Sequence, residues 1–235
     1  MPVVATNTAA NSALRFLNNN SSMAAGSVGK LASGSRIVKA SDDAAGLAIG
    51  TRLKADVTAL TQAGINASQG ASVVQVADGG LARIGDVLQR MKALAAQSLS
   101  GVPTDTERGF IDAEFQELMS EVDAIANTTR FNGQSLLNGT AAASDYFVGT
   151  DVSDTITVAF SNLAVAGANG YHATALGLSA ATVATAVDAA SAMADIDTAI
   201  DTISEARATA GALISRFEFR GQQIATSLEN IDAAK

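Results

Sequence analysis

Apolar residues recur at alternating spacings of three and four through the segment from residue 43 to residue 99. No proline interrupts this segment, so nothing in it forbids a continuous helix. The periodicity predicts one long helix that packs lengthwise on another helix. Five glycines in its central part lower its intrinsic stability, so we expect that neighbouring helices compensate for them or that glycine permits close approach. The apolar series is Val74, Ala77, Leu81, Ile84, Leu88, Met91 and Ala95, and the glycines are Gly64, Gly70, Gly79, Gly80 and Gly85.

A second, shorter helix is predicted over residues 105–127. Pro103 ends the preceding stretch, and Thr104 stands three residues before Glu107, which is the spacing of a capping box. The same four-three rhythm follows, and the segment ends in the turn-forming sequence NTTRFNG. We therefore expect this helix to fold back on the first. Its apolar positions are Ile111, Phe115, Leu118, Val122 and Ile125.

The middle of the chain changes character and predicts a small β element. Residues 146–149 and 155–160 are rich in β-branched and aromatic side chains, and the second run alternates with a period of two. The turn sequence GTDVSD separates them. We expect a hairpin over residues 144–162, followed by a loop over residues 163–180.

The helical rhythm returns over residues 181–235. It predicts a C-terminal helix whose apolar stripe packs along the stripe of the first long helix. The fold class that we expect is therefore mainly α: an elongated rod of long antiparallel coiled-coil helices with a small β-hairpin. The positions of this last stripe are Met193, Ile196, Ile200, Ile203, Arg207, Ala210, Ile214, Phe217, Gly221, Ile224, Leu228 and Ile231.

Composition narrows the possible functions. The chain has 235 residues, a net charge of −8 and scattered basic residues, which argues against binding to nucleic acid or to anionic membranes. It contains no cysteine, so disulfides and thiolate chemistry are excluded. The N-terminus lacks the pattern of a cleaved signal peptide, and no apolar run reaches the length of a membrane span.

No residue constellation predicts an enzyme, a cofactor or a metal site. His172 is the only histidine and has no zinc-binding companions, and no nucleophile–base motif accompanies it. Ser41, Asp42 and Asp43 precede the first long helix. The two carboxylates could bind a cation, but we favour a role in capping and charging the helix N-terminus. The N-x-[ST] triplets at Asn20, Asn66, Asn127 and Asn138 are too short a signal to predict glycosylation.

Three segments carry a resemblance to bacterial flagellins. They are GKLASGSRIVKASDDAAGLAIG at residues 29–50, LQRMKALAAQS at residues 88–98 and TRFNGQSLL at residues 129–137. The resemblance implies a rod domain in two parts, residues 43–180 and 181–235, preceded by a filament-core and export segment over residues 1–42. It also implies a minimal subunit without large outer domains, because little sequence lies between the hairpin and the C-terminal helix.

The family resemblance further implies a location, partners and contact residues. Flagellins leave the cell unfolded through the flagellar type III export channel and polymerise into the secreted, extracellular filament that drives swimming. Self-association, an export chaperone, and cap and junction proteins are the partners that this implies. Arg90, Leu94 and Glu114 match positions that contact Toll-like receptor 5, although a solvated rod surface and contact between subunits are alternative interpretations.

Two alternative functions remain open at this stage: a hook–filament junction protein, and a flagellin-like cell-surface binding protein. The segment from Ser41 to Leu47 favours flagellin over the first, and the small outer region disfavours the second. The family's C-terminus continues into a final helix that this sequence does not contain. We therefore expect these 235 residues by themselves to assemble poorly into filaments.

Overall fold

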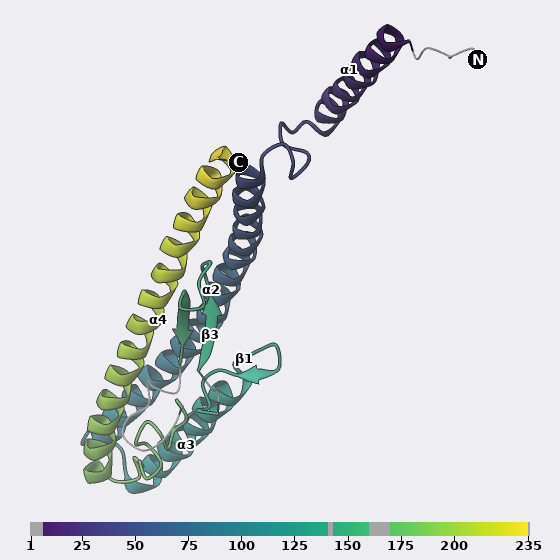
Figure 1. The fold of residues 1–235 in the computed structure, drawn as a ribbon. Helices are drawn as coiled ribbons and strands as arrows, with labels where there is room; N and C mark the ends of the chain where they lie inside the picture. Colours follow the sequence, from purple (N-terminus) through teal and green to yellow (C-terminus); the bar gives the residue numbers. More distant parts are fainter. Residues whose placement is uncertain (1–6, 141–142, 160–169, 235) are drawn as a thin grey trace. The chain divides into compact units, whose positions relative to one another are not determined.

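The computed structural model describes residues 7–140, 143–159 and 170–234. The chain falls into two compact units that divide between Asp56 and Val57. The division lies inside the helix α2 (Ala44–Leu99), so the domain boundaries that we expected after residues 42 and 180 stay predictions. The fold class, mainly helical with small antiparallel strand pairs, is confirmed. Figure 1 shows the elements in chain order.

In the second unit, α2 packs antiparallel against α4 (Ala186–Ala234). A Cβ atom added at Gly64 would lie 3.7 Å from Ile224, and one added at Gly85 would lie 3.8 Å from Ile203. Both distances are ordinary van der Waals contacts, so a methyl group would fit at these two positions. At Gly70, in contrast, a Cβ atom would lie 2.5 Å from the Phe217 ring of α4, so glycine permits the close approach of the two helices there. The apolar series predicted for α2 is confirmed, because all seven of its side chains are fully buried.

The seam of α4 differs by one residue from the predicted one at every second position. Ile196, Ile203 and Ala210 are buried as expected. The residues predicted between and beside them on this seam are not buried, because the residue one position earlier takes the buried place in each case. The buried residues at these positions are Ala192, Ala199, Ala206 and Leu213, whereas Met193, Ile200 and Ile214 lie partly buried on the flank of the core.

Helix α3 (Asp105–Thr128) packs beside α2 and begins with the predicted capping box. The Glu107 backbone N–H donates to Thr104 Oγ1 at 3.4 Å, and the Thr104 backbone N–H donates to the Glu107 carboxylate at 2.7 Å. The Arg108 guanidinium donates to the backbone carbonyl groups of Ser98 and Ser100. These bonds fix the turn between α2 and α3.

Two small antiparallel hairpins follow α3. Strands β1 (Arg130–Phe131) and β2 (Gln134–Ser135) form the first, which the sequence analysis did not predict although its Asn132-Gly133 turn was visible. Asn132 and Gly133 both have positive φ angles, 49° and 80°, as such a two-residue turn requires.

Strands β3 (Ser144–Phe147) and β4 (Thr155–Val158) form the second hairpin. It lies within the predicted range of residues 144–162, of which residues 160–162 fall outside the described residues. The hairpin packs on the α2–α4 pair through the Tyr146 ring, which meets the Phe217 ring edge-on at a centroid distance of 5.6 Å. The Asn66 side chain also donates to the Phe147 carbonyl at 3.0 Å.

Residues 170–185 are part of the core, which the sequence analysis did not anticipate. Tyr171, Leu178 and Val183 are fully buried. Asp112 on α3 accepts hydrogen bonds from the Thr182 hydroxyl and the Val183 N–H, both at 2.8 Å. Because these bonds hold residues 182–183 outside helical geometry, α4 begins at Ala186 and not at residue 181 as predicted.

The first unit contains helix α1 (Thr8–Ser33), which is well capped at both ends. Asn7 Oδ1 accepts from the Ala10 N–H at 3.0 Å, and Gly34 adopts a positive φ of 67° at the C-cap. No residue of α1 is buried.

Candidate subunit-contact surfaces

Asp43 caps α2, and Asp42 organises the turn before it. The Gly46 N–H donates to Asp43 Oδ1 at 2.9 Å. Asp42 instead accepts from the N–H groups of Lys39 and Val38, which lower the pKa of its carboxyl group, with a smaller contribution from Lys30 at 3.3 Å. Ser41 is exposed in the same turn. The capping role thus belongs to Asp43, and the two carboxylates point to different partners.

The segment after α1 and the first turns of α2 line an open groove of about 460 Å³, which we call the basic groove. Ile37 forms one wall and packs over Gly46, where a Cβ atom would lie 2.8 Å from the Ile37 terminal methyl group. A Cβ atom at Gly50 would meet nothing within 4 Å, so the groove stays open there. Its lining combines apolar and cationic side chains. The lining residues include Arg36, Ile37, Gly46, Leu47, Gly50 and Lys54.

The exposed face of α3 carries a stripe of carboxylates next to an exposed aromatic ring. We call Phe110, Glu114, Glu117 and Glu121 the acidic stripe. Their spacings of four, three and four residues place them on one side of the helix. The Phe110 side chain is 73% exposed. Within the described residues, Glu117 and Glu121 form no hydrogen bond or ion pair, so their carboxylates are open to a partner.

The structure brings Arg90 and Glu114 together but separates Leu94 from them. The Arg90 guanidinium donates twice to Glu114 Oε1, at 2.9 and 2.5 Å, across the α2–α3 surface. Leu94 is only 2% exposed because it lies in the core below this pair. Leu94 therefore offers almost no surface to a partner, and a contact surface here consists of the ion pair.

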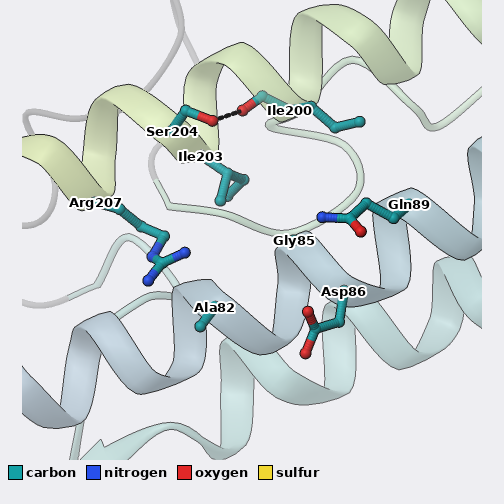
Figure 2. Close-up of a pocket in the computed structure, with 8 residues that line it drawn as sticks. All are labelled: Ala82, Gly85, Asp86, Gln89, Ile200, Ile203, Ser204 and Arg207. Carbon is teal, nitrogen blue, oxygen red and sulfur yellow. Dashed lines mark hydrogen bonds between the residues drawn. The ribbon is translucent and has the colours of Figure 1, made fainter.

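A second, smaller groove of about 240 Å³ lies between α2 and α4 (Figure 2). Figure 2 shows Ile203 and Arg207 of α4 facing Ala82 and Gly85 of α2. The charged groups at its rim are already paired, Arg207 with Asp78 at 3.0 Å and Asp86 with Arg83 at 3.5 Å. The hydroxyl group of Ser204 donates to the carbonyl of Ile200 at 2.8 Å. Among the described residues, this hydroxyl group donates to a backbone carbonyl and not to a side-chain base.

The single histidine has a structural role. His172 Nδ1 accepts a hydrogen bond from the Ala175 N–H at 3.1 Å, and the His172 carbonyl accepts from the Leu176 N–H at 3.0 Å. The imidazole therefore closes a turn of residues 172–176. No cluster of potential metal ligands occurs among the described residues.

The structure thus defines a class of protein: long helices packed lengthwise, with exposed charged side chains and, in the part of the chain that the structure describes, no enclosed site with reactive groups. Within the described residues, no helix has the length and apolar character to cross a membrane. Comparison with known proteins identifies the family within this class. Residues 4–142 match the family described as bacterial flagellin N-terminal helical region, and the chain belongs to the bacterial flagellin family.

Similar proteins agree with this assignment. The chain is 32% identical over 233 residues to the flagellar filament 30.7 kDa core protein of Treponema maltophilum, covering 94% of this chain and 80% of that protein. It is 38% identical over 224 residues to a flagellin of Listeria monocytogenes serovar 1/2a, covering 87% and 78% of the two chains. The crystal structure of Bacillus cereus flagellin matches with a TM-score of 0.60 at 26% identity, covering 73% of this chain and 95% of that one.

Membership in this family fixes the general function. The chain is a structural subunit of the flagellar filament, which is extracellular and forms by association of flagellin copies, and it is not an enzyme. The contact roles expected for Arg90, Leu94 and Glu114 stay predictions.

Proposed function

We propose that the subunits polymerise by burying the apolar stripe of α1 between neighbouring copies. Helix α1 is 26 residues long and has no buried residue, yet it carries an apolar side chain at almost every position of a heptad seam. Leu14, Leu17, Val28 and Leu31 are between 55% and 85% exposed. A helix with such a stripe is stabilised when another surface covers it. This single observation carries the proposal.

The size of the effect is sufficient to drive assembly. Covering one Leu or Val side chain contributes about 1.5–3 kcal/mol. Four such side chains on each subunit contribute about 6–12 kcal/mol, and this gain recurs at every contact along the polymer. Because the surface of one copy meets a different surface of the next, the contact is heterologous and extends into an open filament.

A pair of variants tests the stripe. Leu17→Asp places a charge in the stripe and should reduce incorporation of a tagged chain into the filaments of cells that also produce the unmodified chain. Asn19→Asp adds the same charge on the opposite face of α1 and should incorporate normally. Equal incorporation of both variants, measured by immunogold labelling of sheared filaments, would show that the stripe is not a contact.

The finer partners follow from the family likeness. We infer export through the flagellar type III channel, recognition by an export chaperone, and contact with cap and junction proteins, with residues 1–42 as the export and filament-core segment. The prediction is that filaments sheared from cells producing this chain contain it with its N-terminal peptide intact, as peptide mass mapping would show. Retention of the chain inside cells that build filaments would contradict it.

Recognition by Toll-like receptor 5 is a further proposal, limited to the exposed Arg90–Glu114 pair. Arg90→Ala removes the cation and should lower receptor signalling by the purified chain. Arg83→Ala removes an exposed arginine from the same helix, where it pairs with Asp86 at 3.5 Å, and serves as the matched control. Equal signalling by the two variants in a receptor-reporter cell assay would exclude this contact.

A further inference from the structure

The charge of the chain is divided unevenly between its two units. Residues 1–56 contain six Lys or Arg against three Asp or Glu, a net charge of +3. The remaining residues contain nine basic against twenty acidic groups, a net charge of −11. Opposite charges on two parts of one subunit attract when the first part of one copy meets the second part of another.

From this division and the two surfaces described above, we infer that the basic groove of one copy receives the acidic stripe of a second copy, with Phe110 as the inserted side chain. The inference rests on the proposed polymerisation and assigns a second contact that does not involve the stripe of α1. A second copy is the occupant because the chain itself supplies the complementary charge and the exposed aromatic ring.

The groove has the chemistry that an aromatic side chain flanked by carboxylates requires. Ile37 and Leu47 offer apolar contacts for a ring, and Arg36 and Lys54 line the same groove. Arginine and lysine attract carboxylates and the faces of aromatic rings. The open space at Gly50 leaves room for a side chain that enters from outside.

The spacing of the two surfaces also agrees. Leu47 and Lys54 are seven residues apart on α2, and Phe110 and Glu117 are seven residues apart on α3. Each separation is two helical turns, about 10.5 Å along the axis. A ring placed on Leu47 by a parallel helix would therefore bring Glu117 beside Lys54.

Phe110 is the side chain of α3 that most needs a partner. It is 73% exposed, whereas Phe115 on the opposite side of the same helix is fully buried. Burial of an aromatic side chain in a pocket is the usual anchor of a protein contact, and surrounding charges set its specificity. The neighbouring Glu117 and Glu121 supply these charges.

Site-directed cross-linking tests this contact directly, because the chain contains no cysteine. Gly50→Cys places a thiol at the open side of the groove, and Ala113→Cys places one beside Phe110. A short bis-maleimide should join a mixture of the two variants, made with tags of different mass, into a heterodimer. Ala194→Cys on the exposed surface of α4 is the matched control and should give a lower yield with Gly50→Cys.

Three further measurements separate this contact from chance collisions. Phe110→Ser should lower the heterodimer yield, whereas Phe219→Ser, which removes a ring that is 70% exposed on α4, should not. Glu117→Lys should lower the yield by up to about fivefold, the contribution of one exposed ion pair, and Lys54→Glu in the partner should restore it. Raising the salt concentration from about 50 mM to about 300 mM should also lower the yield, since salt screens exposed charges.

The possible outcomes distinguish the two proposals. Equal yields with Ala113→Cys and Ala194→Cys would overturn the groove contact, and if Leu17→Asp still blocks incorporation, the polymerisation proposal would stand. Failure of both the cross-link and the α1 test would overturn the proposed burial of the α1 stripe as well. A selective cross-link that depends on Phe110 and on the charge pair would support the inference.

Discussion

Phe217 of α4 lies directly over Gly70 of α2, where a Cβ atom would come within 2.5 Å of the ring. The Phe217 side chain is 1% exposed and also meets the Tyr146 ring of the β3–β4 hairpin. The ring is therefore held from two sides and has little freedom to move away. This contact joins α2, α4 and the hairpin in a single layer of the core.

Gly70→Ala should destabilise the fold by about 1–3 kcal/mol, the usual cost of overpacking a close contact, even though alanine favours helix formation. Gly79→Ala is the control, because a Cβ atom there would meet nothing within 4 Å. That variant should be neutral or up to about 1 kcal/mol more stable. Urea unfolding followed by circular dichroism measures both. Equal changes in the free energy of unfolding for the two variants would mean that the Phe217 ring moves aside without an energetic cost.

Ala206→Leu and Arg207→Leu test the one-residue difference between the predicted and the observed seam of α4. Ala206 is 1% exposed, so a larger side chain there should destabilise the fold by about 1–3 kcal/mol. Arg207→Leu loses an exposed ion pair with Asp78 and should cost less than about 1 kcal/mol. If the seam ran through residue 207, the leucine at 207 would stabilise the fold and the order would reverse in the same unfolding experiment.

The helices could be predicted from the sequence because their signal is periodic and local. The α2 stripe is confirmed at every position, and the Thr104–Glu107 box marks the start of α3. The prediction for the α4 seam was only half right, because a pattern drawn through large apolar residues places Ile200 on the seam, whereas Ala199 is the buried residue. Close packing against another helix favours the smaller side chain, and this preference depends on the partner, not on the local sequence.

The core segment of residues 170–185 could not be predicted, because its burial is determined by contacts distant in sequence. Its apolar residues follow neither a helical nor a strand period. Asp112 and Asp123 of α3 hold its backbone, through bonds to the N–H groups of Val183 and Ala173. Of the candidate site residues, Asp43 was placed correctly as a cap by local logic. The burial of Leu94 follows from the position of α3, which the sequence pattern does not reveal.

Glu107→Gln should make the stability of the protein less sensitive to acid. The Thr104 N–H and hydroxyl groups donate hydrogen bonds to the carboxylate and lower the pKa of Glu107 below its usual value of 4.5. A group whose pKa is lowered by folding stabilises the fold above the unfolded pKa, and this contribution is lost as the pH falls through the folded pKa. The variant should therefore be less stable than the wild type at neutral pH, and the difference should shrink as the pH drops below 4.5.

Thermal unfolding of both proteins over this pH range measures the effect of Glu107. Glu117→Gln is the control, because within the described residues its carboxylate accepts no hydrogen bond that folding would protect. The stability of Glu117→Gln should equal that of the wild type at every pH. A constant difference between Glu107→Gln and the wild type at all pH values would show that the capping bond does not depend on the ionised form.

Tyr171→Phe should leave the stability unchanged or raise it by up to about 1–3 kcal/mol. The Tyr171 side chain is fully buried, and its hydroxyl group has no hydrogen-bond partner among the described residues. Burial, with a smaller effect of the Glu205 charge, raises the pKa of this phenol well above its usual value. An unpaired buried hydroxyl group carries its desolvation cost without compensation, so its removal relieves the fold of that cost.

The ring of Tyr171, in contrast, is essential to the core that residues 170–185 form with α3. Tyr171→Ala should cost about 3–5 kcal/mol, the usual loss for deletion of a large buried aromatic side chain. Urea unfolding of the two variants separates the hydroxyl group from the ring. A loss of more than about 1 kcal/mol in Tyr171→Phe would show that the hydroxyl group is hydrogen-bonded in solution. In that case residues 170–185 would be held by a polar contact in addition to the packing of the ring.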